Sequence, residues 1–262
     1  HNETFDVLEK AFATREPDIV LVPNFEASTK SSFMSWSYKY WHSVLKQLRQ
    51  GSWKGVKLGL VHGDTASTLF GAITLRLIGS QVAHIEAGLR SSKLSSPFPE
   101  EIIRRLVSKL SHIHFCPDAS SAANLHDISG KVVETQGNTL RDALALALSF
   151  DITSQHHAGS NYAVVSLHRN ENLSNTNTLN MLMGEIVEAS KIIRVKFVLH
   201  PATREKLKKT QWQKILTGTE NIQLLDRVDY PDFVKLLIQS NFLMTDGGSN
   251  QEEAAMLGLP TL

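Results

Sequence analysis

The chain has 262 residues, enough for one large core or for two α/β domains of ordinary size. Its 27 Lys and Arg residues almost balance 26 Asp and Glu residues, so neither nucleic acid nor a membrane surface is an expected partner. The single cysteine, Cys116, excludes an internal disulfide and a paired-cysteine metal site, and it fits a reducing compartment. Because no apolar run has the length of a membrane-spanning helix and no signal-peptide pattern opens the chain, we expect a cytoplasmic protein without membrane contact.

The first fifth of the chain predicts a helix, a strand and a second helix. Residues 5–12 favour a short helix, and residues 18–22 (Asp-Ile-Val-Leu-Val) favour a buried strand. Aromatic and aliphatic residues then recur at helical spacing over residues 33–48, and Gly51 follows as a stop signal. We interpret this stripe as core packing rather than as a binding surface.

Two acidic residues follow consecutive predicted strands. Residues 56–61 and 82–85 form short apolar runs on either side of a predicted helix over residues 66–78. Asp64 and Glu86 come directly after these strands. In a right-handed crossover, both carboxylates lie at the carboxyl edge of a parallel sheet, where open α/β sheets bind ligands.

A third acidic position opens the next helix. Prolines 97 and 99 precede an apolar helical pattern that begins at residue 102, so Glu100 and Glu101 lie near a helix start. Spacing alone also allows a structural interpretation, in which Glu101 pairs with Arg105 and Glu100 with Arg104 as surface ion pairs. For Asp64 and Glu86, the position at a strand end favours a functional role.

The rest of the first half continues the alternation of strands and helices. A strand over residues 111–117 carries His112 and His114, which could form a metal pair. No third ligand stands at a suitable spacing, so we expect no metal site. A helix over residues 122–125, a strand over residues 132–135 and a helix over residues 140–150 follow.

The alternation restarts after a polar stretch over residues 151–161, which we interpret as a linker. Strands are predicted over residues 162–167, 195–199, 222–225 and 242–245, with helices over residues 179–189 and 230–239. The prediction is therefore an α/β protein of two doubly wound, Rossmann-like domains, one over residues 1–150 and one over residues 162–262.

A glycine turn follows the last predicted strand. Gly247 and Gly248 precede a predicted helix start. Because glycines have no side chain, a diphosphate could come close to the free backbone N–H groups at this helix terminus. Such turns are also common structural features of α/β proteins. A carboxylate one turn further on could accept hydrogen bonds from ribose hydroxyls.

Several motifs together resemble the non-hydrolysing UDP-N-acetylglucosamine 2-epimerases. In the first half, the family patterns HGDT, H-x-EAGLR and SPxPEE are matched by residues 62–65, 84–90 and 96–101. In the second half, HRRE, a His-Pro strand end and DSGGxQEE are matched by residues 168–171, 200–201 and 246–253. Residues 137–139 match the family's Gly-Asn-Thr turn, and the resemblance covers residues 56–262.

The resemblance implies a glycosyltransferase-B-like fold with the active site in a cleft between the two domains. It implies an isomerase that interconverts UDP-GlcNAc and UDP-ManNAc through a glycal intermediate, for surface polysaccharide precursors, without cofactor or metal and as a homodimer. By motif match, the residues that it implies are catalytic Asp64, Glu86, Glu100 and His168, diphosphate-binding Gly247, Gly248 and Ser249, ribose-binding Glu253, and Arg169 and His200 in the UDP site.

The sequence departs from the family pattern at several points. The family's amino-terminal GTRPE turn is absent, as is the segment after the last motif, so we expect a fragment that lacks both ends and the first strand. Asp246-Gly247-Gly248-Ser249 stands for DSGG, Asn170 for an arginine, and Lys93 for a residue that is often acidic. These changes leave open a 2-epimerase of another UDP-2-acetamido sugar. A glycosyltransferase-B-fold glycosyltransferase is the other alternative, because it shares fold and nucleotide seat.

Overall fold

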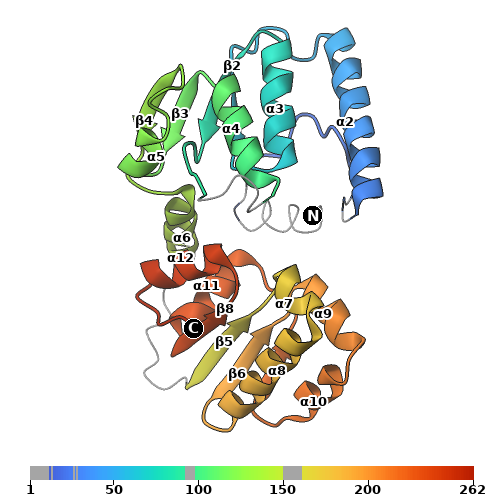
Figure 1. The fold of residues 1–262 in the computed structure, drawn as a ribbon, viewed down its shortest axis with the longest axis vertical. Coiled ribbons are helices and arrows are strands. Elements are labelled where there is room, and N and C mark those ends of the chain that lie inside the picture. The colour runs from blue at the N-terminus through green and yellow to red at the C-terminus, as the bar shows by residue number, and fades with distance from the viewer. Residues whose placement is uncertain (1–11, 13, 26, 28, 92–97, 150–160) are drawn as a thin grey trace. The chain divides into compact units, whose positions relative to one another are not determined.

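The computed structural model describes residues 12, 14–25, 27, 29–91, 98–149 and 161–262 (Figure 1). It divides into two compact units, which contain Arg15–Thr139 and Leu140–Leu262. Except for residues 12 and 161, the predicted helix over residues 5–12 and the predicted linker over residues 151–161 fall outside the described residues, as does Lys93.

The first unit is a parallel sheet with helices packed against it. Its strands β1 (Leu58–His62), β2 (Gln81–Ile85), β3 (Ile113–Cys116) and β4 (Lys131–Glu134) lie in the order β1-β2-β3-β4. Its helices are α2 (Lys30–Gln50), α3 (Ala66–Leu77), α4 (Glu100–Leu110) and α5 (Ala119–Ala123). Helix α2 begins at a capping box on Thr29 and ends at Gly51, which adopts the left-handed conformation with φ 68°.

Helices α3 and α4 cover the part of the sheet that carries the predicted acidic residues. Their side chains bury Val61 of β1 and Val82 of β2 together with Ala72, Ile103 and Val107. This packing fixes α4 against the strands, so the first turn of α4 is held in place by the core rather than by a loop.

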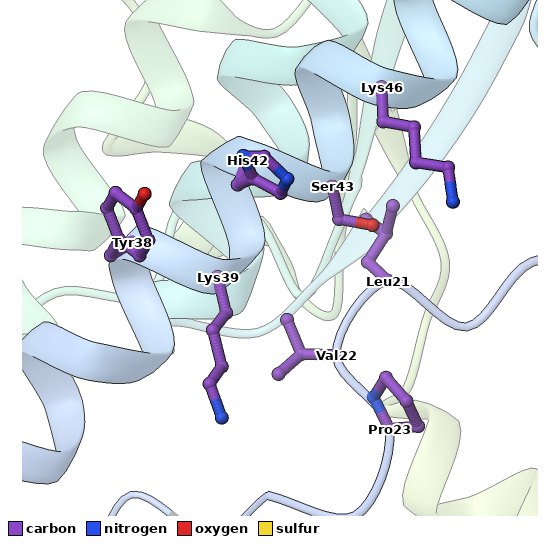
Figure 2. Close-up of a pocket in the computed structure, with 8 residues that line it drawn as sticks. All are labelled: Leu21, Val22, Pro23, Tyr38, Lys39, His42, Ser43 and Lys46. Atoms are coloured by element: carbon purple, nitrogen blue, oxygen red, sulfur yellow. The ribbon is translucent and has the colours of Figure 1, made fainter.

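The predicted strand over residues 18–22 is wrong. These residues form bends and irregular backbone outside the described sheets, and Leu21, Val22 and Pro23 line one side of an open pocket of about 430 Å³ beside α2 (Figure 2). The other side consists of Tyr38, Lys39, His42, Ser43 and Lys46 of α2. An apolar β-branched run favours extended backbone, but a strand also needs a neighbouring strand to accept its hydrogen bonds, and none pairs with this segment among the described residues.

The second unit is a doubly wound sheet. Its strands β5 (Tyr162–Ser166), β6 (Arg194–Val198), β7 (Ile222–Leu225) and β8 (Phe242–Thr245) are parallel and lie in the order β7-β6-β5-β8. Val165 and Phe197 face the cluster that includes α8 (Thr176–Ser190), α9 (Pro201–Lys208) and α10 (Trp212–Gly218). Val164 and Leu243 face α11 (Tyr230–Ile238) and α12 (Gly248–Met256) on the opposite side. A short helix, α7 (Asn170–Ser174), follows β5.

The strand order reverses between β5 and β8. The chain leaves β5 toward β6 on one side and reaches β8 on the other, so the carboxyl ends of these two strands flank a topological switch point. Ligands of doubly wound sheets bind at such a point. His168 follows β5 and Asp246 follows β8, which places two of the motif matches there.

Helix α6 (Thr139–Ser149) belongs with the second unit. Its Leu144 and Ala147 are buried in one cluster with Val234 of α11, and the division between the units falls after Thr139. The sequence predicts a first domain that ends at residue 150, eleven residues beyond this division. Helical spacing identifies an apolar face but does not say which sheet that face covers, which accounts for the difference.

Candidate active site

Two carboxylates lie at adjacent strand ends in the first unit. Strands β1 and β2 pair in parallel with His62 opposite Ile85, and Asp64 and Glu86 follow these two residues. One carboxylate oxygen of Glu86 lies 3.7 Å from His62 Nε2, and a Cβ built on Gly63 would meet the same oxygen at 3.7 Å. The carboxylate of Glu86 therefore lies beside the turn that carries Asp64.

The backbone at Glu86 has an unusual conformation. Its φ is +64°, which non-glycine residues seldom adopt. Gly88, two residues later, has φ +82°, and a Cβ there would lie 2.1 Å from the Ser121 carbonyl oxygen, so only glycine fits. Residues held in sparsely populated conformations cluster at functional sites, and this tight turn aims the Glu86 side chain.

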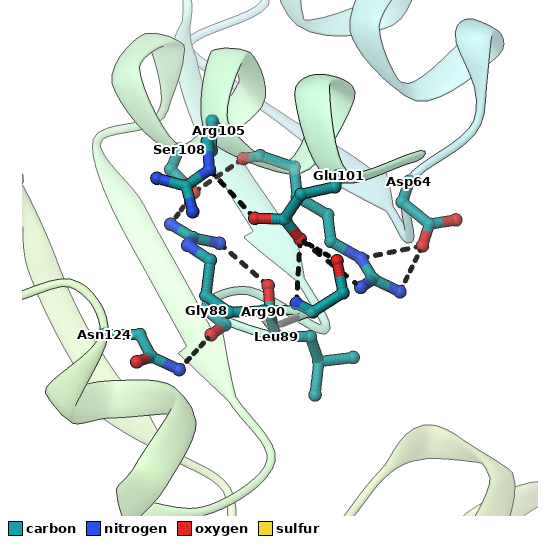
Figure 3. A network of polar contacts seen from close by, with 10 residues as sticks. Asp64, Gly88, Leu89, Arg90, Glu101, Arg105, Ser108 and Asn124 are labelled. Carbon is teal, nitrogen blue, oxygen red and sulfur yellow. Dashed lines mark hydrogen bonds and ion pairs between the residues drawn. The ribbon is translucent and has the colours of Figure 1, made fainter. Parts of the chain in front are cut away.

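The structure separates the two adjacent glutamates at the start of α4. Glu101 is fully buried and accepts hydrogen bonds from the Ser91 N–H, the Ser91 hydroxyl and Arg105 Nε (Figure 3). Burial raises the pKa of Glu101, but these hydrogen bonds outweigh it and hold the pKa below its ordinary value. Glu100 has no such support, since its Oε2 is buried without a hydrogen-bond partner in the described part of the chain.

The predicted ion pairs of α4 are half correct. Arg105 does pair with Glu101 at 2.9 Å, but Glu101 is buried rather than on the surface. Arg104 pairs with Asp64 instead of Glu100, with Nη2 at 2.7 Å and Nε at 2.9 Å from Asp64 Oδ2. The i, i+4 rule cannot foresee this contact, which joins residues 40 positions apart.

A buried histidine supports the turn beneath Asp64. His84 of β2 contacts the Gly63 carbonyl oxygen through Nε2 at 2.8 Å and is 1% exposed. Burial lowers the pKa of His84 to about 4, with the Gly63 carbonyl partly opposing this effect. A neutral His84 therefore donates its proton to this carbonyl near neutral pH.

In the second unit, the carboxylate of Asp246 binds the segment that follows β5. Its carboxylate accepts hydrogen bonds from the backbone N–H groups of His168 (2.9 Å) and Arg169 (3.0 Å) and from Asn172 Nδ2 (3.0 Å). Although burial raises the pKa of Asp246, these donors outweigh it and lower the pKa overall. The carboxylate thereby fixes the backbone of His168 at the switch point.

Gly247 makes room for the imidazole of His168. A Cβ at Gly247 would lie 2.5 Å from His168 Cε1, so the ring rests against the chain at the start of α12. Gly248 and Ser249 begin this helix, where the first N–H groups have no intrahelical acceptor and suit an anion. The ring of His200, after β6, lies 5.6 Å from that of His168.

Glu253 lies one turn further along α12. It is 3% exposed, and its Oε2 is buried without a hydrogen-bond partner in the described residues. Burial raises the pKa of Glu253 to about 7. The hydroxyl of Tyr230 lies beside the Glu253 carboxylate and lowers its pKa, but this effect only partly offsets burial. Arg169, in contrast, is exposed.

Nothing in the described residues forms a metal centre or a membrane span. No three His, Cys, Asp or Glu side chains come together there as a metal set. His112 accepts a hydrogen bond from the Val82 N–H at Nδ1, and His114 contacts the Ser129 carbonyl oxygen. Among these same residues, no helix is long and apolar enough to cross a bilayer.

Comparisons with known proteins agree with the motif resemblance. The sequence profile described as UDP-N-acetylglucosamine 2-epimerase matches residues 54–262. The chain belongs to this family. The UDP-N-acetylglucosamine 2-epimerase of Neisseria meningitidis is 34% identical over 220 residues, which covers 78% of this chain and 58% of that protein. The chain spans 55 to 58% of the length of four curated relatives that it matches.

Solved structures of the same family share the fold. The Methanocaldococcus jannaschii UDP-GlcNAc 2-epimerase in complex with UDP-GlcNAc and UDP has a TM-score of 0.78 and 26% identity, over 98% of this chain and 71% of that one. The Neisseria meningitidis enzyme bound to UDP-GlcNAc has a TM-score of 0.77 and 29% identity, over 100% of this chain and 72% of that one. The predicted two-domain, glycosyltransferase-B-like α/β fold is thereby confirmed, whereas the cleft between the domains stays a prediction.

Three side chains that organise the site of this epimerase-family chain were not predicted from its sequence. Arg104 holds Asp64, His62 contacts Glu86, and Asp246 fixes His168. A signal existed for His62 and Asp246, because each lies next to a strand end within a quoted motif. For Arg104 the only sequence signal was its place on the same helix as Glu100.

Proposed function

We propose that the protein is a UDP-N-acetylglucosamine 2-epimerase that interconverts UDP-GlcNAc and UDP-ManNAc. The observation that carries this proposal is the pair of carboxylates, Asp64 and Glu86, at adjacent ends of β1 and β2 in a chain of the epimerase family. Glu100 is the first residue of α4, and Arg104 of this helix forms an ion pair with Asp64. The third motif is thereby connected to the sheet edge that carries Asp64 and Glu86.

The chemistry explains the need for several acids. The hydrogen on C2 of the sugar is not acidic, since no carbonyl is attached to that carbon, and simple proton abstraction would be slow. In an elimination, a base takes the C2 proton while the C1–O bond breaks and its electron pair leaves with UDP, which gives a glycal. Protonation of C2 on the other face and attack of the UDP oxygen on C1 then give the epimer.

The elimination and the re-addition require a base, an acid on the opposite face of the sugar and stabilisation of an oxocarbenium-like state. We assign these roles to the group Asp64, Glu86 and Glu100. Glu100 suits proton transfer, because its buried Oε2 has no competing hydrogen bond within the described residues. His168 is assigned to the leaving diphosphate, where a proton or hydrogen bond would favour departure of UDP.

The second unit is proposed to hold UDP. The start of α12, with Gly247, Gly248 and Ser249, offers backbone N–H groups to the diphosphate at the β5/β8 switch point. Glu253 is suited to the ribose hydroxyls, since its buried Oε2 lacks a partner in the described part of the chain. Arg169 and His200 complete the proposed site. By family resemblance, we also propose a cytoplasmic homodimer that supplies precursors of surface polysaccharides.

A second candidate is a 2-epimerase of another UDP-2-acetamido sugar. The observation in its favour is the order Asp246-Gly247-Gly248-Ser249, in which the serine stands two positions later than in the family pattern DSGG. As a result, the residue that lies against His168 is Gly247 and carries no hydroxyl. A glycosyltransferase of the same fold would not need the Asp64, Glu86 and Glu100 group.

The test uses the complete open reading frame that contains this chain, incubated with UDP-GlcNAc in heavy water and followed by proton NMR. We expect a manno-configured product with deuterium at C2, because the proton removed by the base exchanges with solvent. UDP binding without product or exchange would contradict the proposal and leave the other UDP-sugar or the glycosyltransferase. A UDP-glucose control reports whether the 2-acetamido group is required.

A further inference from the structure

Arg104 lies between two carboxylates of different character. Both of its contacts to Asp64 end on one oxygen, Oδ2, at 2.7 and 2.9 Å (Figure 3). Its Nη1 also lies 3.7 Å from Glu101 Oε2. Arg104 and Asp64 are only 19% and 26% exposed, so water competes weakly for this pair.

Glu101 is built into the scaffold around Arg104. It is fully buried, and the Ser91 backbone, the Ser91 hydroxyl and Arg105 saturate it. A buried carboxylate with this many donors has a fixed position, since moving it would leave a charge unpaired. The guanidinium of Arg104 is consequently held from both sides.

The geometry points to Arg104 as the positioning residue of the Asp64 carboxylate, with Glu101 as the anchor that orients Arg104. Arg104 occupies Oδ2 and leaves Oδ1 of Asp64 without a hydrogen bond in the described part of the chain, so Oδ1 is the oxygen presented to the substrate. The two glutamates of the motif then have different tasks: Glu100 serves the reaction and Glu101 the scaffold. This inference rests on the proposed epimerase function.

The test compares Arg104→Met with Arg105→Met in the complete protein. Both variants remove a cation that contacts Glu101, but only the first removes the contact to Asp64. We expect Arg104→Met to lower kcat about 100-fold with KM within about threefold, because a misplaced catalytic group costs rate rather than binding. Arg105→Met should stay within about threefold in kcat.

A double-mutant cycle separates positioning from a general loss of structure. If Arg104 acts through Asp64, adding Arg104→Met to the Asp64→Asn variant should lower the remaining kcat by less than about threefold. Arg104→Lys keeps a charge beside Glu101 without the planar fork, so it should fold, bind UDP normally and recover part of kcat.

Equal losses in the two methionine variants, or a full additive loss in the Asp64→Asn background, would overturn the inference while leaving the epimerase function intact. An unchanged kcat in Arg104→Lys would also overturn it, because the fork would then be dispensable. A wild-type protein without C2 exchange would instead remove the proposed function and this inference together.

Discussion

The missing side chain at Gly247 decides where the imidazole of His168 can lie. A Cβ there would stand 2.5 Å from His168 Cε1, the tip of a rotatable and half-exposed side chain. We therefore expect Gly247→Ala to turn the ring away with little loss of stability and to lower kcat for epimerisation at least tenfold. Steady-state kinetics and the melting temperature measure both effects.

Gly184, inside α8, provides the control. A Cβ there meets no atom within 4 Å, so Gly184→Ala should leave kcat unchanged and stabilise the helix by about 0.5 to 1 kcal/mol. If Gly247→Ala kept the full kcat, the ring of His168 would not need its place against α12.

Residue positions could be predicted where a strand end determined them and not where folding joined distant residues. Asp64 and Glu86 were expected at one sheet edge and lie there. Arg104 was assigned by local spacing to Glu100, whereas its partner is Asp64. Local periodicity contains no information on which helix face meets which strand end, and that contact depends on how α3 and α4 pack on β1 and β2.

At the scale of elements, β2 and β3 bury two histidines side by side. His84 and His114 face each other in the strand register, and burial lowers the pKa of both, that of His84 to about 4. The unfolded chain takes up these protons below about pH 6.5, but folded His84 does so only near pH 4. The stability that His84 contributes by staying neutral is therefore fully present above about pH 6.5, and it is lost as the pH drops from 6.5 to 4.

For His84 alone, this loss amounts to about 2 kcal/mol at pH 5. We expect His84→Gln to show a smaller drop in melting temperature between pH 7.5 and pH 5 than the wild type. His126→Gln, which alters a histidine whose side chain is 74% exposed, should keep the wild-type drop. The same drop in His84→Gln as in the wild type would exclude His84 as its source.

Elements with strong apolar periodicity were predicted well, and polar ones were not. Strands β7 and β8 have the bounds predicted from the apolar runs at residues 222–225 and 242–245. Helix α9 was missed because it buries only Thr203 and Leu207 and is otherwise rich in charged residues, which leaves little pattern. Residues 18–22 show the opposite failure, because this apolar run has no strand to pair with among the residues that the structure describes.

At the scale of the molecule, the two units are defined by packing rather than by the polar stretch between the predicted domains. Helix α6 precedes that stretch, yet its Leu144 is 4% exposed and packs with Val234 of α11. Leu144→Ala should cost the second unit about 2 to 5 kcal/mol through the cavity it leaves.

Hydrogen exchange read by mass spectrometry tests this assignment, because it reports the stability of each segment separately. Peptides from β5, β6 and β8 should exchange faster in Leu144→Ala, while peptides from β1, β2 and β3 keep wild-type protection. Leu146→Ala, on the same helix but 45% exposed, should change neither group. Faster exchange confined to β1, β2 and β3 would assign α6 to the first unit, since a helix stabilises the sheet on which its apolar face is buried.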